Sequence, residues 1–393
     1  MKKILFILYT CCILLFPVSA QQIPSFKAND RIVFLGNSIT EGGHYHSYIW
    51  LYYMTHFPEL PLRIYNGGIG GDCASHMVFR FDSDIKIKKP TYLVCSFGMN
   101  DSGYDGYNKP GYDKYANKQV EYANTEFGKL QQQILADKKI KNVVLLGSSP
   151  YDENVKLEGV ETLHGKNETI KRIIEMQAEV AQKRGWGFVN FNTVMCELNK
   201  EIQQSDSTAT FCGGDRIHPD KDGHMVMAYL FLKAQGLAGK EVAYFHINAT
   251  NRKAMEERNC RITHIKNEND TISFSYLSRS LPFPVDTIPR WGTKGTARDA
   301  VRQIPFMQEM NQEIMKVTDL HGNFRVTIDG TEIGCWDSNE LSKGINLAEI
   351  TCTPQYQQSL SIMYLNEERC AIEKRLRQYI CLLYTSPSPR DGL

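Results

Sequence analysis

Residues 31–40 read RIVFLGNSIT, an apolar run that ends abruptly in Gly36-Asn37-Ser38. A run of apolar residues without polar alternation predicts a strand that is buried on both faces. A glycine two positions before a serine allows a sharp turn, which would present the serine hydroxyl at the end of the strand. Taken alone, the same three residues also fit an ordinary turn in which Ser38 caps a helix.

Further short apolar runs follow along the chain, at residues 62–66, 92–97, 142–147 and 187–191. Helical stretches lie between and after them, most clearly at residues 115–137, 168–184 and 221–235. This alternation predicts an α/β protein, a three-layer α/β/α fold around a doubly wound, flavodoxin-like parallel sheet. In such a fold ligands bind beyond the carboxyl ends of the strands.

Three more motifs are predicted to lie near the carboxyl ends of these strands. Residues 66–72, NGGIGGD, close the second strand, and residues 98–101, GMND, follow the third. Residues 215–219, DRIHP, open the last helix of the same region. Because the carboxyl ends of parallel strands meet at one edge of the sheet, we expect these motifs to lie together with Ser38.

Ser38 requires a base within hydrogen-bond reach before its hydroxyl becomes a useful nucleophile. The candidate base is His218, and Asp215 is spaced to hold the Nδ1 side of its imidazole. Pro219 fits the first turn of the helix that follows. Singly, Asp215 also fits a helix cap and His218 an ordinary surface imidazole, so neither residue establishes the site on its own.

Two positions are suited to stabilise a developing oxyanion. Asn100 follows a buried strand and carries a side-chain amide that can donate a hydrogen bond. Gly71 lies in a glycine-rich loop, where a backbone N–H can approach a substrate closely; Gly68 is a competing candidate in the same loop. The spacing of these glycines does not match G-x-G-x-x-G after the first strand, which excludes the dinucleotide-binding interpretation.

These four blocks, in this order over residues 30–236, resemble the SGNH hydrolases, also called the GDSL esterase/lipase family. The resemblance implies that Ser38 is the nucleophile and an oxyanion donor through its own N–H, with Gly71 and Asn100 as the other donors. It also implies that His218 is the general base and Asp215 its partner. Gly71 is preferred to Gly68 because Gly-Asp-Cys matches the family's Gly-Asp-Thr. Asn37 departs from the family's Gly-Asp-Ser.

The two ends of the chain are predicted not to belong to the fold. Residues 1–20 have the pattern of a secretory signal peptide, with two lysines, an apolar run and small residues before the cleavage site; an uncleaved anchor is the alternative. Residues 381–393 resemble the read-through translation of a sequencing adapter, against the alternative of a natural Ser/Pro-rich tail. The mature protein is therefore expected to be exported, either periplasmic or secreted.

The remaining chain is divided into three parts. Residues 21–239 form the predicted SGNH hydrolase domain. Residues 240–345 alternate in hydrophobicity around turns such as Asp329-Gly330, which predicts a small antiparallel β-rich accessory module. Residues 346–380 are predicted to be a C-terminal helical segment that packs back on the first domain.

Composition narrows the class of partner. The net charge of +1 gives no indication of nucleic-acid binding, and no stable membrane insertion is expected once the signal peptide is removed. Eight of the 11 cysteines lie outside the two ends, and none forms a C-x-x-C pair typical of a zinc site. The serine mechanism requires no cofactor and no metal.

We therefore expect an exported serine ester hydrolase that removes short acyl groups, above all O-acetyl groups on carbohydrate, through an acyl-enzyme; the resemblance implies an exported bacterial carbohydrate-esterase-like member of the family. Its substrate would be a glycan ester or a small-molecule ester. Aromatic residues in the predicted loops could form platforms for sugar rings or simply pack the loops onto the sheet; they are Tyr45, His46, Tyr48, Tyr104 and Tyr107. The alternatives are a lysophospholipase or general lipase, and a non-catalytic glycan-binding protein. The oligomeric state stays open.

Overall fold

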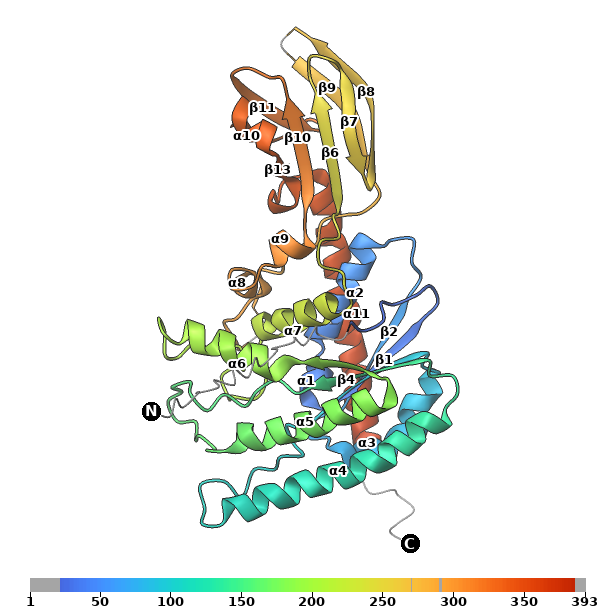
Figure 1. The fold of residues 1–393 in the computed structure, drawn as a ribbon, viewed down its shortest axis with the longest axis vertical. Coiled ribbons are helices and arrows are strands. Elements are labelled where there is room, and N and C mark those ends of the chain that lie inside the picture. Colours follow the sequence, from blue (N-terminus) through green and yellow to red (C-terminus); the bar gives the residue numbers. More distant parts are fainter. Residues whose placement is uncertain (1–21, 270, 290–291, 386–393) are drawn as a thin grey trace, which may run out of the picture.

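The structure, a computed structural model, describes residues 22–269, 271–289 and 292–385 (Figure 1). The predicted signal peptide and residues 386–393 of the predicted read-through lie outside the described residues. Within these ranges, none of the helices combines the length and the apolarity needed to cross a membrane.

The centre of the first domain is a five-stranded sheet in the order β2-β1-β3-β4-β5, in which every pairing is parallel. Its strands are β1 (Arg31–Gly36), β2 (Arg63–Gly68), β3 (Tyr92–Phe97), β4 (Asn142–Gly147) and β5 (Gly187–Asn190). This order is that of the flavodoxin-like doubly wound sheet, so the predicted fold class is confirmed.

Each strand divides its side chains between two hydrophobic clusters. On β1, Ile32 and Phe34 face one cluster, whereas Val33 and Leu35 face the other. The first cluster is covered by α2 (His44–His56), α6 (Phe191–Ile202) and α7 (Lys221–Ala234). The second is covered by α3 (Ala74–Arg80), α4 (Tyr112–Ala136) and part of α5 (Lys166–Arg184). The sheet is therefore buried on both faces, which explains why its strands are apolar throughout.

Short helices connect some of these elements at the edge of the sheet. The helix α1 (Ser38–Gly42) follows β1 directly. A π-helical turn, η1 (Phe81–Ile85), and a 3-10 turn, η2 (Lys86–Lys88), continue α3 toward β3. Of these segments, α1 packs directly on β1 and β2.

The β-rich module forms the upper part of the molecule in Figure 1. A sheet in the order β13-β10-β6-β7 combines β6 (Ala243–Asn248), β7 (Lys253–Arg258), β10 (Glu313–Thr318) and β13 (Ile345–Asn346). Two hairpins accompany it, as the turn signals indicated: β8 (Cys260–Glu268) with β9 (Thr271–Ser278), and β11 (Asn323–Ile328) with β12 (Thr331–Asp337). The helix α10 (Ser338–Lys343) and the turn η3 (Leu347–Glu349) complete it.

The module differs from expectation because β6 and β10 pair in parallel. The prediction of a purely antiparallel module was therefore wrong. Parallel neighbours require a long connection, and here the chain leaves the module between β9 and β10. It returns to the hydrolase domain through α8 (Ala297–Val301) and α9 (Phe306–Met310), and residues such as Phe283 and Phe306 join the first hydrophobic cluster.

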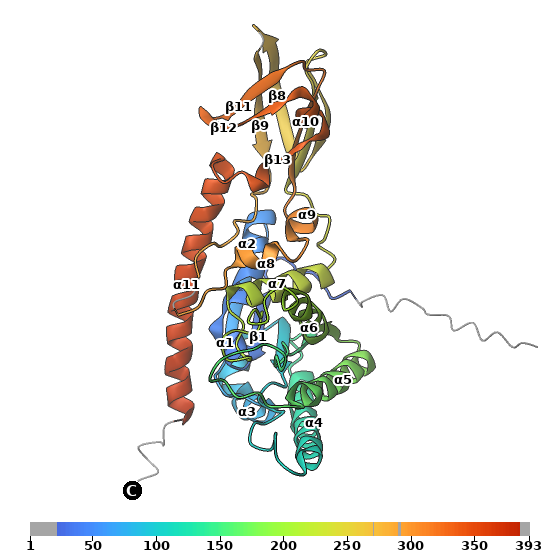
Figure 2. The same cartoon turned by 90° about the vertical axis from the view of Figure 1, so that its left-hand side faces the viewer.

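The last element, α11 (Pro354–Thr385), begins later than the predicted start at residue 346, because residues 345–349 form β13 and η3 of the module. It also continues to Thr385, into the segment that was predicted to be read-through and not part of the fold. Figure 2 shows it running along one side of the molecule, from the module past α2 and the sheet. It packs back on the first domain, where the Asn366 amide donates to the Ser47 carbonyl at 3.1 Å and contacts the Ser47 hydroxyl at 2.9 Å.

Candidate active site

Ser38 lies where β1 turns into α1. Asn37 caps this helix, because its Oδ1 accepts a hydrogen bond from the Ile39 N–H at 3.0 Å. Ser38 is then the first helical residue, whose own N–H has no acceptor within the helix. Asn and Asp serve equally well as caps, so the replacement of the family's Asp by Asn37 preserves this turn.

His218 and Asp215 meet Ser38 from the segment that precedes α7. The Ser38 Oγ lies 2.7 Å from His218 Nε2, and His218 Nδ1 lies 2.6 Å from Asp215 Oδ2. The other oxygen of Asp215 accepts the N–H groups of Ile217 and His218, both at 2.9 Å. The structure thus brings the three predicted residues into one hydrogen-bonded series that can activate a hydroxyl.

Electrostatics keep this carboxylate ionised. Burial works to raise the pKa of Asp215, but the hydrogen bonds from the His218 ring and from the two backbone N–H groups outweigh it. The pKa of Asp215 therefore lies below its ordinary value. An ionised Asp215 can orient the imidazole and balance a charge that forms on it.

Arg216 anchors the segment, a role that the sequence did not indicate. Its backbone has a positive φ of 70°, which turns the chain between Asp215 and His218. Its side chain is buried and donates to the Asp152, Val155 and Val160 carbonyls at 3.1, 2.6 and 3.3 Å. These contacts tie the Asp-x-x-His segment to the loop after β4.

The two candidate donors in the glycine-rich loop after β2 differ in whether their backbone N–H already has an acceptor. The Gly68 N–H is buried and donates to Asn66 Oδ1 at 2.9 Å, so it is already occupied. Gly71 is exposed, adopts a φ of 79°, and its N–H has no acceptor among the described residues. Gly71 rather than Gly68 is thus available to a ligand.

Asn100 is held at the same loop by two hydrogen bonds. Its Nδ2 donates to the Asp72 carbonyl at 3.0 Å, and its Oδ1 accepts from the Tyr104 hydroxyl at 2.7 Å. The neighbouring Asp101 is buried and accepts the Ala74 and Gly98 N–H groups, both at 2.8 Å. Together these contacts join the loop after β3 to the start of α3.

A buried lysine lies beneath the Asn100 loop. The Lys166 ammonium donates to the Met99 and Gly103 carbonyls at 2.9 and 2.6 Å and to the Ser102 hydroxyl at 2.6 Å. The ring of Tyr104 covers it, with its centroid 3.8 Å from Nζ. Burial lowers the pKa of Lys166 to about 7. The sequence gave no signal for this residue, which begins a helix more than 60 positions away.

The predicted aromatic platforms are largely absent. Tyr45, His46 and Tyr48 do not lie in a loop; they belong to α2 and are buried in the core. Tyr107 is buried as well. Of the five residues, only Tyr104 is half-exposed, and it lies beside Asn100. The prediction that they cluster in loops at the site was therefore wrong for the three that lie in α2.

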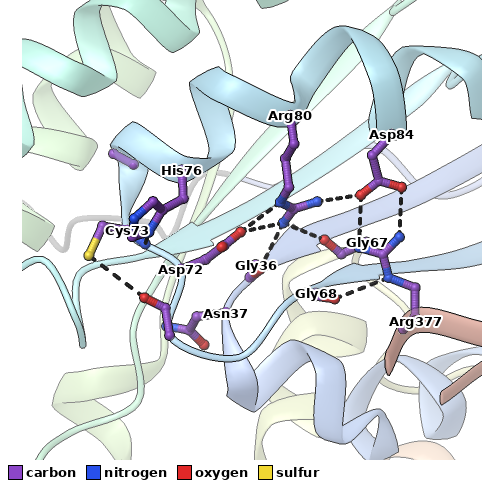
Figure 3. A network of polar contacts seen from close by, with 12 residues as sticks. Gly36, Asn37, Gly67, Gly68, Asp72, Cys73, His76, Arg80, Asp84 and Arg377 are labelled. Carbon is purple, nitrogen blue, oxygen red and sulfur yellow. Dashed lines mark hydrogen bonds and ion pairs between the residues drawn. The ribbon is translucent and has the colours of Figure 1, made fainter. Parts of the chain in front are cut away.

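A buried ionic network contacts the carboxyl ends of β1 and β2 and Asp72 of the glycine-rich loop (Figure 3). Arg80 bonds Asp72 Oδ2 at 2.7 Å and Asp84 Oδ2 at 2.6 Å, and it also donates to the Gly36 and Gly67 carbonyls. Arg377 of α11 bonds both oxygens of Asp84, at 2.6 and 2.8 Å. Arg80 therefore lies at the carboxyl ends of β1 and β2, and Arg377 lies at the end of β2, where it donates to the Gly68 carbonyl at 3.1 Å.

A flavodoxin-like sheet of this order, with a serine after β1 and an Asp-x-x-His segment before α7, is the arrangement of the SGNH hydrolases. The chain belongs to the GDSL-like lipase/acylhydrolase family, whose model matches residues 34–226, and it is a carboxylic ester hydrolase.

Individual relatives were found by sequence and by structure. The solved structure of BT4096, a gut microbial diltiazem-metabolizing enzyme, is 50% identical and covers 92% of this chain and 82% of that one, with a TM-score of 0.90. An acetylxylan esterase from Geobacillus stearothermophilus is 22% identical over 224 residues, which are 53% of this chain and 95% of that protein. The solved structure of Axe2, an acetylxylan esterase from the same organism, has a TM-score of 0.42 at 20% identity, over 53% of this chain and 95% of that one.

Proposed function

We propose that this chain is a serine esterase that removes short acyl groups, above all O-acetyl groups, from carbohydrate. The observation that carries the proposal is the hydrogen-bonded series from Ser38 through His218 to Asp215. The similarity to an acetylxylan esterase supports the acyl group and the class of alcohol.

In the proposed mechanism, Ser38 Oγ attacks the ester carbonyl while His218 Nε2 takes its proton. The tetrahedral intermediate collapses, the C–O bond to the alcohol breaks, and His218 returns the proton to the leaving oxygen. Water then attacks the acyl carbonyl while His218 takes its proton, which gives a second tetrahedral intermediate. This intermediate collapses, the bond between the acyl carbon and Ser38 Oγ breaks, and His218 returns the proton to Oγ as acetate leaves. Asp215 orients the imidazole throughout.

Three donors would stabilise the negative oxygen of both intermediates: the N–H groups of Ser38 and Gly71, and the Nδ2 of Asn100. The support for this assignment is that the first N–H lies at a helix start and the second has no acceptor in the described part of the chain. The third is aimed by its bonds to Asp72 and Tyr104. Each such donor contributes about 2.7–4 kcal/mol to barrier lowering in serine hydrolases.

A second candidate substrate is a small, non-carbohydrate acetate. It is favoured by the 50% identity to an enzyme described as metabolizing diltiazem, a molecule that carries an acetate ester. The side chains of His218 and Asp215 are 43% and 51% exposed, so the centre lies near the surface and is accessible to a bulky alcohol. Both substrates contain the same scissile bond.

The test is acetate release from acetylated xylooligosaccharides, diltiazem and an aryl acetate by the mature protein and by Ser38→Ala. We expect the highest kcat/KM on the oligosaccharides and loss of activity on all three in the variant. Equal rates for both proteins would exclude Ser38 as nucleophile. Faster release of long acyl chains from a lysophospholipid would instead favour the lipase alternative.

We also propose export with cleavage after Ala20. It is supported by the charged, apolar and small-residue pattern of residues 1–20. Expression of the full chain in a bacterium and N-terminal sequencing of the protein from the periplasm should find Gln21 as the first residue. An intact N-terminus on cytoplasmic protein would contradict this.

A further inference from the structure

The helix α11 lies against the outer edge of β2, the edge strand of the sheet. The Asn66 N–H donates to Glu373 Oε1 at 2.7 Å, and the Gly68 carbonyl accepts from Arg377 Nε at 3.1 Å. Glu373 and Arg377 are four residues apart, a helical rise of about 6 Å, and Asn66 and Gly68 are two residues apart, a strand rise of about 6.6 Å. The spacing of the two side chains therefore matches the spacing of the two backbone groups that they bind. The helix thus occupies the hydrogen-bonding positions of a missing sixth strand.

Arg377 does more than cover an edge, because it shares a carboxylate with the network behind the site. Asp84 accepts both guanidinium groups, that of Arg377 from α11 and that of Arg80 from α3. Arg377, Arg80 and Asp84 are each at most 2% exposed. Burial would raise the pKa of Asp84, but Arg377 and Lys88 outweigh it and hold that pKa well below its usual range.

The same network reaches the loop of the candidate oxyanion donor from both ends. Gly68, where the loop begins, is held through its carbonyl by Arg377. Asp72, where the loop ends, is held through its side chain by Arg80 and through its carbonyl by Asn100. Between these two anchors, Ile69 is buried and its N–H donates to the Gly36 carbonyl at 3.1 Å, whereas Gly70 and Gly71 are exposed. Figure 3 shows the Asp84 carboxylate joined to both Arg80 and Arg377, which approach it from different elements.

We propose that Arg377 is a positioning residue for ester hydrolysis, through which α11 fixes the loop that carries Gly71. This inference rests on the proposed function, because it assigns Gly71 as an oxyanion donor. Arg377 does not touch the substrate. Its loss would displace the Gly71 N–H from the position that the negative oxygen occupies in the transition state, while ground-state binding would change little.

The test compares Arg377→Met with Arg375→Met, a control at an exposed position two residues earlier on α11. With an aryl acetate we expect Arg377→Met to lower kcat about tenfold to a hundredfold, with KM within about twofold, since small misplacements of this kind have such effects. Arg375→Met should retain full activity. Inhibition by phenylboronic acid, whose tetrahedral serine adduct places oxygen in the same hole, should weaken in parallel with kcat.

A second variant, Arg377→Lys, distinguishes loss of positioning from loss of folding. It keeps a cation for Asp84 but cannot also donate to Gly68 as the guanidinium does. We expect it to fold with an unchanged circular dichroism spectrum and to lose kcat, by less than the Met variant. Full kcat in a folded Arg377→Lys or Arg377→Met protein would overturn the inference. Ser38→Ala distinguishes failure of this inference from failure of the proposed function, because activity in that variant would overturn the proposed function.

Discussion

At the scale of single residues, Asn100 is the most direct test of the proposed oxyanion hole. Asn100→Ala removes Nδ2, which donates to the Asp72 carbonyl and is the third proposed oxyanion donor. We expect kcat to fall by about two to three orders of magnitude, because the removal of one oxyanion donor has an effect of this size in serine hydrolases. The thermal unfolding temperature should change little. Steady-state kinetics measure the effect, and an unchanged kcat would remove Asn100 from the mechanism.

Tyr104 orients the Asn100 amide and covers the buried Lys166. Tyr104→Phe keeps the ring over the ammonium but removes the hydroxyl that donates to Asn100 Oδ1. We expect kcat to fall several-fold, about the value of a neutral hydrogen bond, and far less than in Asn100→Ala. The same substitution made in Asn100→Ala should have no further effect on kcat. Additive effects of the two changes would show that the hydroxyl acts independently of the amide.

At the scale of elements, the five strands of the parallel sheet were predicted to within two residues at each end, whereas β6, β7, β10 and β13 of the module were not predicted. Strands that are buried on both faces produce continuous apolar runs, which are a strong local signal. The helix α2 was missed because the sequence of residues 44–56, HYHSYIWLYYMTH, has apolar or aromatic residues on every side and no amphipathic period. Arg216, Lys166 and Arg377 were missed for another reason. Each finds its partners only when distant segments meet, and no local pattern records that.

Two glycines in different elements should respond in opposite ways to alanine. A Cβ at Gly68 would lie 2.2 Å from the Glu41 N and 2.8 Å from the Asn37 carbonyl oxygen, both of them backbone atoms. At Gly128, within α4, it would meet nothing within 4 Å. We expect Gly68→Ala to destabilise the fold by about 1–3 kcal/mol and Gly128→Ala to stabilise it by about 0.5–1 kcal/mol. Urea denaturation measures both changes, and equal midpoints would contradict the close packing of α1 on β2.

Glu313 makes the strand β10 sensitive to pH. It is fully buried and accepts from the Tyr276 hydroxyl and the Gln355 amide, and burial raises the pKa of Glu313 to about 7. The unfolded chain releases this proton at lower pH, so folded protein binds more protons between about 4.5 and 7. Its contribution to stability therefore falls as the pH rises, by about 1.4 kcal/mol per unit in that interval.

Thermal unfolding at pH 5 and pH 8 tests this assignment. The melting temperature of the unchanged protein should drop more between these values than that of Glu313→Gln, which has no carboxylate to ionise. Glu268→Gln, at an exposed position of a hairpin, is the control and should follow the unchanged protein. An identical drop in all three proteins would show that Glu313 is not responsible.

At the scale of the whole molecule, the hydrolase domain and the β module are expected to unfold together. Phe283, Phe306 and Met310 lie between module strands in the sequence, yet they are buried in the core with α2 and α7. We expect a single calorimetric transition for the chain, and an insoluble product from a chain that ends at residue 239. Two separated transitions would show that the parts fold independently.

The chain passes between the hydrolase domain and the module four times: before β6, after β9, before β10 and after β13. This has a consequence for how such a protein can be inherited. A module joined at one junction can be exchanged between genes as a cassette, whereas this one would need several coordinated breaks within a single coding sequence. Its strands and the hydrolase core should therefore descend together, and relatives that possess one without the other should differ throughout the segment that contains α8 and α9.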